Sequence, residues 1–415
     1  MSDNTSAAGA LTGRRRTAIV VTLGALSAFG PLSMDLYLPS LPSLGRSLGA
    51  SDSLVQLTMS VCMVGLAAGQ LAGGPLSDRF GRRRPLVLGV TAFAVTSALC
   101  ALAPNIGILI AMRLLQGLAG SFGIVISRAV VRDLFRGDGA ARVFSALMMV
   151  TGVAPVIAPL AGGQIVRVTD WRGLFVVLFV VGVLLSLAAL SLPETLPEQE
   201  RRPAGLRAEF AVLVRDRRFT GYALVMSLTG CALFTYISFG TFVLQGEYGL
   251  SAQEFSAVFA AISVGIVLAG NLNRIIVGRF SPAALVTAGT GIGLAGALLA
   301  LTAVLSGVGL PALLPGLFVV AAVAGIISPN ATAMSMDGHG DRAGSASAML
   351  GVLQFTTGAI VPPLVSAAVG ATAVSMTATM LVSFTAALAA LAAVASRTAI
   401  TAPESAQLVL DPEFK

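Results

Sequence analysis

Twelve apolar stretches, each about as long as a bilayer is thick, constrain this chain more than any other feature of its sequence. A helix needs about twenty residues to cross roughly 30 Å of hydrocarbon. Only 11% of the residues are charged, whereas soluble domains carry roughly 25%. The sequence therefore excludes a soluble globular protein and predicts an all-α integral membrane protein. The expected spans lie near residues 17–38, 53–74, 85–103, 106–131, 143–166, 172–192, 220–245, 253–273, 282–306, 311–336, 345–369 and 371–396.

A polar segment with several prolines divides the spans into two sets of six. The string GGPLSDRFGRRRP after the second span has a weaker counterpart, GNLNRIIVGRFSP, after the eighth, which suggests that the two sets are repeats. Two such bundles would place a binding site between them, near the middle of the membrane. The expected parts are a cytoplasmic tail (1–16), a six-helix bundle (17–192), a cytoplasmic linker (193–219), a second six-helix bundle (220–396) and a second cytoplasmic tail (397–415).

The distribution of basic residues predicts the orientation of the chain, because Lys and Arg in short loops are retained on the cytoplasmic side. With a cytoplasmic N-terminus, the outward loops hold only Arg46, Arg167 and Arg172 of the 26 Lys and Arg residues. Both termini are therefore expected in the cytoplasm, in a multi-pass protein of the cell membrane. The net charge of +7 then reflects topology and not binding to nucleic acid.

The ionisable residues deep inside the expected spans are essentially Asp35 and Arg113, which lie at similar depth, with Arg128 near the inner end of the fourth span. A charge at the bilayer centre costs about 2.5 to 3.5 kcal/mol, so such residues usually pair, face a wet cavity or mark a proton pathway. We predict that the two residues serve proton coupling, in which the carboxylate loses and regains a proton as its distance to the arginine changes. The alternatives are a salt bridge that only fastens two helices, and an Asp35 at the membrane surface.

The string GPLSDRFGRRR after the second span is the most specific local pattern. A loop that only sets topology needs arginines but no acid at its centre. Because Asp78 can accept hydrogen bonds from a helix N-terminus or an arginine, the string predicts a gate, with a generic turn as the alternative. Its two glycines are expected to permit tight turns. The gate residues predicted from this string are Gly74, Asp78, Arg79, Gly81 and Arg82.

The string VAPVIAPLAGG in the fifth span places two prolines and two glycines within two helical turns. Prolines remove backbone hydrogen bonds, and glycines let a neighbouring backbone approach. We therefore predict a bend at which another helix packs closely. The residues are Pro155, Pro159, Gly162 and Gly163.

The expected substrate cavity is mostly apolar, because few polar side chains interrupt the spans. For each aromatic residue singly, packing or contact with lipid is the alternative. The single histidine, His339, lies in a polar loop, and the three cysteines lie in apolar runs, so neither a histidine-based enzyme nor a metal site is indicated. The candidate cavity residues are Tyr37, Gln116, Phe234, Tyr236, Phe239, Asn330, Gln354 and Phe355.

At these strings the chain resembles the major facilitator superfamily, whose loop motif after the second helix matches GPLSDRFGRRRP almost throughout. Further strings resemble the Bcr/CflA drug-resistance subfamily, over residues 17 to 396. They are SMDLYLPSLP, RLLQGLAGS, SRAVVRD, APLAGG, FVLQGEYGLS and AGSASAMLGVLQF. The resemblance implies a fold of twelve membrane helices and a proton-driven exporter of drugs, with chloramphenicol-type and bicyclomycin-type compounds among the family's substrates.

The resemblance also implies roles for individual residues. Asp35 and Arg113 match the family's helix 1 acid and helix 4 arginine, which are implicated in proton coupling. Asp78 matches the acid that holds the inner gate, with expected partners at Gly344, Ser345 and Arg132. The antiporter pattern of helix 5 is met only in part, because alanines occupy positions 154 and 158, where the broader pattern has glycine.

We therefore expect a transporter and not an enzyme, with protons as the coupling ion, no cofactor and a small lipophilic drug as substrate. It is expected to work as a monomer in the lipid bilayer. A metabolite carrier, such as a sugar or organic-acid symporter, is the alternative within transport, although it would need more polar side chains at mid-helix. A non-transport membrane protein is the alternative from another class.

Overall fold

The computed structural model describes residues 13–400 apart from residues 136, 202–205 and 339–342, so His339 lies outside the described residues. Within these ranges, eleven helices are long and apolar enough to cross a membrane. A bent pair, Gly13–Ser27 with Phe29–Leu48, supplies a twelfth. The predicted all-α fold with twelve membrane spans is therefore confirmed.

The helices before the linker segment form a first group, which we call the N-half. Its later helices agree with the predicted spans to within a few residues, with two exceptions. The helix predicted over 53–74 continues to Phe80, and the helix predicted over 143–166 already begins at Gly137. The group consists of α1 (Gly13–Ser27), α2 (Phe29–Asp35), η2 (Leu38–Ser40), α3 (Leu41–Leu48), α4 (Asp52–Phe80), α5 (Arg83–Ala101), α6 (Ile106–Leu134), α7 (Gly137–Ile165) and α8 (Trp171–Leu190).

The helices after the linker segment form a second group, which we call the C-half. The linker segment itself contains η3 (Glu198–Glu200) and the amphipathic helix α9 (Leu206–Arg215), which the sequence did not predict. The C-half consists of α10 (Arg217–Thr241), the π-helical turn η4 (Phe242–Glu247), α11 (Ala252–Ile276), α12 (Pro282–Leu305), α13 (Leu310–Ala322), α14 (Ala324–Met336), α15 (Ala343–Val369) and α16 (Ala373–Ile400).

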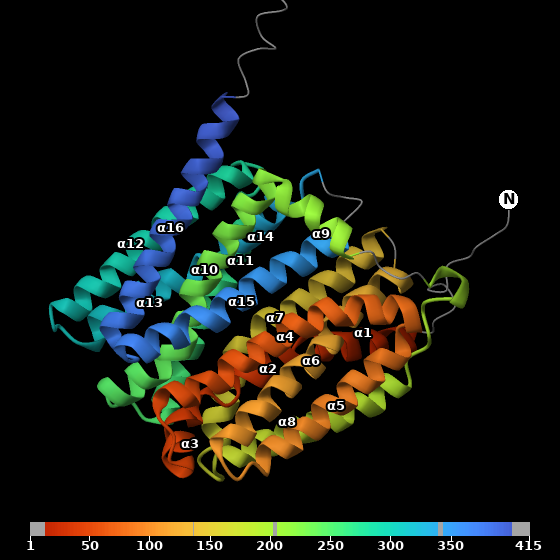
Figure 1. The fold of residues 1–415 in the computed structure, drawn as a ribbon, viewed down its shortest axis with the longest axis horizontal. Helices are drawn as coiled ribbons and strands as arrows, with labels where there is room; N and C mark the ends of the chain where they lie inside the picture. Colours follow the sequence, from red (N-terminus) through yellow and green to blue (C-terminus); the bar gives the residue numbers. More distant parts are fainter. Residues whose placement is uncertain (1–12, 136, 202–205, 339–342, 401–415) are drawn as a thin grey trace, which may run out of the picture.

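Figure 1 shows the N-half at the lower right and the C-half at the upper left. The halves meet where α15 packs against α4 and α11 packs against α7. We call the end of the molecule that carries Arg82, Arg83 and Arg84 the basic end, and the opposite end, which carries α3, the far end.

The first span is not one straight helix, as the sequence predicted, but breaks at Ala28 with a bend of 42°. Pro31 explains the break, because its ring clashes with the carbonyl four residues earlier and it has no N–H to donate. That carbonyl belongs to Ser27, where α1 ends. The short helix α2 therefore lies between this break and the turn that follows Asp35.

The predicted loop after the second span is mostly helical. α4 continues to Phe80, and only Gly81 and Arg82 separate it from α5. Pro75 lies inside this helix, since membrane helices tolerate proline when neighbouring groups satisfy the freed backbone. Gly74 consequently lies in a helix and not in a tight turn, which corrects the prediction for that glycine.

Candidate functional site

Asp35 is the last residue of α2 and is only 5% exposed. Its carboxylate forms no hydrogen bond or ion pair with any residue in the described part of the chain. A charged carboxylate that is buried without a partner is costly, and such groups within membrane helices usually serve a transport pathway. The break at Ala28 and the turn after Asp35 place this acid next to η2, whose Leu38 and Pro39 carbonyls accept hydrogen bonds from the C-half, and therefore at the junction between the halves.

Arg113 lies on α6 and is fully buried inside the N-half. Its Nη1 donates to Gln116 Oε1 (2.5 Å) and its Nε to the Thr58 carbonyl (3.4 Å). The guanidinium carbon lies 4.4 Å from the centre of the Tyr37 ring and 5.7 Å from that of Phe175, both within cation–π range. Nη2 has no partner among the described residues. Arg113 is thus held by side chains and backbone of its own half.

Asp35 and Arg113 do not form an ion pair in this structure. Tyr37, which follows Asp35 by two residues, covers the guanidinium instead. Asp35 ends α2 and Tyr37 lies in the turn that follows, and this turn brings Tyr37, and not Asp35, against Arg113. The sequence placed the two residues at similar depth, but it did not determine which of the two neighbours faces the arginine.

Three of the predicted cavity residues come together between α10 and α15. The rings of Phe234 and Phe355 lie 5.8 Å apart, and Gln354 lies against Gly230. Gly358 contacts both Phe234 and Met63, and Met63 belongs to the N-half. This aromatic cluster therefore borders the junction between the halves.

The other predicted cavity residues are more dispersed. Tyr236 stacks on Phe259 at 5.3 Å, and Phe239 is completely buried. Asn330 donates to Asn273 Oδ1 (2.6 Å) inside the C-half. In the N-half, Tyr37 and Gln116 both bind Arg113, as described above. The structure thus divides the predicted cavity list between the junction and the interiors of the halves.

Arg82 is the centre of an ionic network at the basic end. It forms an ion pair with Asp78 one turn earlier and a second with Asp133 (3.0 Å), which also accepts a hydrogen bond from Thr195 (2.9 Å). The sequence predicts Arg132 as the partner of Asp78 on α6. This prediction is wrong in this structure, because Asp78 pairs with Arg82 and Arg132 is exposed. Adjacent helical residues point about 100° apart, so only one of the two faces α4, and the acid complements Arg82.

Glu194, which the sequence analysis missed, completes this network. Its carboxylate accepts hydrogen bonds from the backbone N–H groups of Arg82 (2.7 Å) and Arg83 (3.1 Å). Partial burial raises the pKa of Glu194, but backbone donors, led by Leu196, outweigh burial and lower the pKa overall. Gly81 has a φ of +85° and lies directly against this carboxylate, so both conformation and space favour glycine there.

The remaining predicted gate residues have smaller roles. Arg79 is exposed, and its guanidinium lies over the Phe80 ring. Ser345 is buried near the start of α15. The surroundings of Gly344 lie outside the described residues, so the predicted contact between Asp78 and this helix stays a prediction.

The two glycines of the fifth span allow close packing at the far end. The α7 helix runs through both of its prolines as a single helix. A Cβ added to Gly162 would overlap the backbone of Leu36. A Cβ added to Gly163 would overlap the Ser256 hydroxyl of α11 and lie 3.1 Å from the Ser256 Cβ. The predicted close approach is present, and it involves both the N-half and the C-half.

Side chains at the far end also form hydrogen bonds from one half to the backbone of the other. Sequence reasoning missed these contacts, although Gln245 lies in the string FVLQGEYGLS, because a glutamine or threonine side chain does not signal its partner in the other half. Their acceptors are carbonyls next to helix ends or breaks. The bonds are Gln56 Nε2 to Ser238 O (3.5 Å), Thr241 Oγ1 to Leu38 O (3.3 Å), Gln245 Nε2 to Pro39 O (3.1 Å) and Gln253 Nε2 to Gly163 O (2.9 Å).

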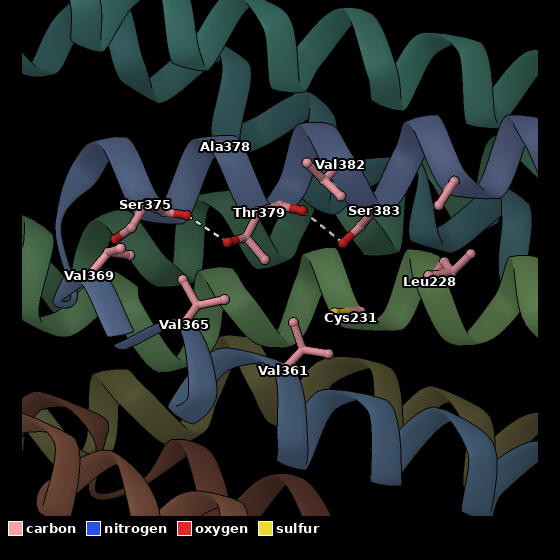
Figure 2. Close-up of a pocket in the computed structure, with 11 residues that line it drawn as sticks. Leu228, Cys231, Val361, Val365, Val369, Ser375, Ala378, Thr379, Val382 and Ser383 are labelled. Carbon is pink, nitrogen blue, oxygen red and sulfur yellow. Dashed lines mark hydrogen bonds between the residues drawn. The ribbon is translucent and has the colours of Figure 1, made fainter. Parts of the chain in front are cut away.

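A separate groove of roughly 380 Å³ lies among α10, α15 and α16, away from Asp35 and Arg113 (Figure 2). Its walls are almost entirely apolar, and the hydroxyls of Thr379 and Ser383 bond to carbonyls of their own helix (2.7 and 2.8 Å). Val382 on its rim is 66% exposed. No group of three or more His, Cys, Asp or Glu side chains that could hold a metal ion occurs among residues whose positions are described.

Twelve apolar spans in two halves, with a buried acid at their junction, define a multi-pass membrane protein of the secondary-transporter type. Residues 21–363 match the family model described as "Major Facilitator Superfamily". The chain belongs to this family, which confirms the predictions of a multi-pass transporter and of a protein that is not an enzyme.

Several relatives cover most of the chain. The "Uncharacterized MFS-type transporter YdgK" of Bacillus subtilis (strain 168) is 41% identical over 364 residues, which is 85% of this chain and 90% of the relative. The "Bicyclomycin resistance protein homolog" of Haemophilus influenzae is 32% identical over 366 residues (87% and 92%). The "Chloramphenicol resistance protein" of Pseudomonas aeruginosa is 30% identical over 285 residues (68% and 67%). These names agree with the predicted drug-resistance subfamily.

The solved structures to which this chain is similar share its fold, at low sequence identity. A bacterial homologue of the human lysosomal transporter Spinster, in an inward-facing and occupied conformation, has a TM-score of 0.73 at 16% identity, covering 94% of this chain and 98% of that one. A D-xylose–proton symporter has a TM-score of 0.69 at 17% identity, covering 89% and 96%.

Proposed function

We propose that this protein exports small lipophilic drugs across the bacterial inner membrane in exchange for protons, by alternating access between its halves. Asp35 carries the proposal, because it is a buried, unpaired carboxylate at the junction of the halves. Two relatives named for bicyclomycin and chloramphenicol resistance favour drugs as substrates. The aromatic cluster around Phe234 supplies an apolar surface that such compounds can contact.

Further parts of the proposal concern topology and assembly. The basic end faces the cytoplasm, since arginine-rich loops are retained there, and both termini lie on that side. The protein acts as a monomer and uses no cofactor other than the proton. A sugar or organic-acid symporter is less well supported, because the likeness to the xylose symporter extends to the fold alone.

The test is a transport assay with purified protein in liposomes that contain a pH-sensitive dye. Adding chloramphenicol to one side should move protons in the opposite direction, and Asp35→Asn should abolish this movement. Drug movement without any pH response would contradict antiport. Failure of the wild type to move any of a panel of lipophilic drugs, together with uptake of a sugar, would favour the symporter.

A further inference from the structure

Two buried polar atoms at the junction of the halves have no hydrogen-bond partner among the described residues. They are Oε1 of Gln56, whose side chain is fully buried, and the hydroxyl of Tyr236, which is 2% exposed. Asp35, only 5% exposed, is likewise unpaired within the described chain. Nearly all buried polar groups in proteins are hydrogen-bonded, so unpaired ones at a junction need an explanation.

Contacts between the halves place these three groups near one another. Gln56 donates through Nε2 to the Ser238 carbonyl, two residues from Tyr236 on α10. The bond from Thr241 to the Leu38 carbonyl sets the register of α10 against η2.

Asp35 precedes Leu38 by three residues, and Tyr236 precedes Thr241 by five. Tyr236 therefore lies about 8 Å before this bond along α10, and Asp35 ends α2, separated from Leu38 only by the turn at Leu36 and Tyr37. The Tyr236 hydroxyl is also within electrostatic range of the Asp35 carboxylate.

Packing does not account for the Tyr236 hydroxyl. The ring stacks on Phe259 at 5.3 Å, and a phenylalanine would make the same stacking contact. The amide of Gln56 uses its nitrogen to bridge the halves, which leaves its oxygen as an acceptor. Each residue therefore presents an unused polar atom beside an acid that is itself unpaired.

We propose that Gln56 and Tyr236 form a polar subsite, one residue from each half, which selects substrates carrying hydroxyl or amide N–H donors next to Asp35. The proposal rests on the proposed export function and adds a substrate preference to it. Gln56 Oε1 can only accept a hydrogen bond, whereas the tyrosine hydroxyl can accept or donate. The matching ligand is a compact apolar molecule with two neighbouring donors, such as a diol or a hydroxy-amide.

The experiment compares three probes in the liposome assay. Chloramphenicol carries two hydroxyls and an amide N–H, a close analogue has fluorine in place of its primary hydroxyl, and tetraphenylphosphonium has no donor. The variants are Tyr236→Phe and Gln56→Leu. The matched control is Tyr222→Phe, which changes a buried tyrosine at the basic end of the same helix. Thermal unfolding of each purified variant checks that it is folded.

We expect Tyr236→Phe to raise the KM for chloramphenicol about twofold to tenfold, the net worth of one hydrogen bond. Export of tetraphenylphosphonium and its proton coupling should not change, and Tyr222→Phe should behave as the wild type. The wild type should prefer chloramphenicol to the fluorinated analogue, and this preference should shrink in Tyr236→Phe. The comparison of the two analogues on the wild type needs no variant, so it remains decisive if a variant fails to fold.

Equal losses for all three probes would indicate a structural role and overturn the subsite. Export of tetraphenylphosphonium without preference for chloramphenicol over its analogue would also overturn it, while leaving the exporter intact. Export of none of the three probes by the wild type would overturn the proposed function and the subsite together.

Discussion

The hydrogen bonds that close the far end make a quantitative prediction about the balance between conformations. Gln245 and Gln253 donate from the C-half to the carbonyls of Pro39 and Gly163 in the N-half, at 3.1 and 2.9 Å. Both bonds join the halves, so both must break when the far end opens and water replaces them. A typical hydrogen bond contributes about 0.5 to 1.5 kcal/mol net. Replacing both glutamines by alanine should therefore favour the open form by about 1 to 3 kcal/mol, or fivefold to 150-fold.

Spin labels on opposite halves at the far end can measure this shift. Arg46→Cys on α3 and Val308→Cys between α12 and α13 provide exposed attachment sites. The three native cysteines are buried, which limits labelling elsewhere. In Gln245→Ala/Gln253→Ala the population with long distances should grow.

A matched control is Gln164→Ala, which removes a glutamine at the same end whose only described side-chain bond is to Arg167 of its own half. The control should keep the wild-type distances. If the double variant also keeps them, the two glutamines do not hold this end closed.

Three further predictions follow from single sites. Gly162→Ala should lower the free energy of unfolding by roughly 1 to 3 kcal/mol through overpacking, and so lower the melting temperature, whereas Gly152→Ala on the same helix meets no atom within 4 Å and should be neutral. Equal melting of the two variants would contradict the close contact. Asp35→Asn should abolish drug resistance in cells without loss of membrane insertion, while Arg113→Ala should lower stability more, and the reverse order of melting would contradict this. Glu194→Gln should lower the melting temperature above pH 4.5, and the difference should vanish as pH falls through the depressed pKa of Glu194; a constant difference would contradict it.

The membrane spans could be predicted from sequence because bilayer thickness fixes the length of an apolar helix independently of tertiary contacts. Gly30 followed by Pro31 also marks the break in the first span, which the length of the apolar stretch alone predicts as one helix. The close approach at Gly162 and Gly163 followed from residue size alone, since only glycine leaves space for a neighbouring backbone.

The partners of charged residues were harder to predict, because they depend on how helices rotate against each other. The choice of Gln116 as a partner of Arg113 follows from spacing on one helix, but the choice of Tyr37 over Asp35 depends on the turn after α2. Similarly, Glu194 binds backbone groups more than a hundred residues earlier in the chain. No local pattern encodes such a contact.

The bonds at the two ends of the molecule differ in what they join, and this difference bears on how coupling can work. The ion pairs of Arg82 with Asp78 and Asp133 lie within the N-half, so they can persist while the halves move as rigid bodies. The far-end bonds to Leu38 and Pro39 join the halves and must break. Asp35 lies within one turn of these two carbonyls, on a short helix isolated by the break at Ala28. If Asp35 is the coupling acid, a change in its charge acts directly on the segment that holds the far end closed, and no long path through the protein is required.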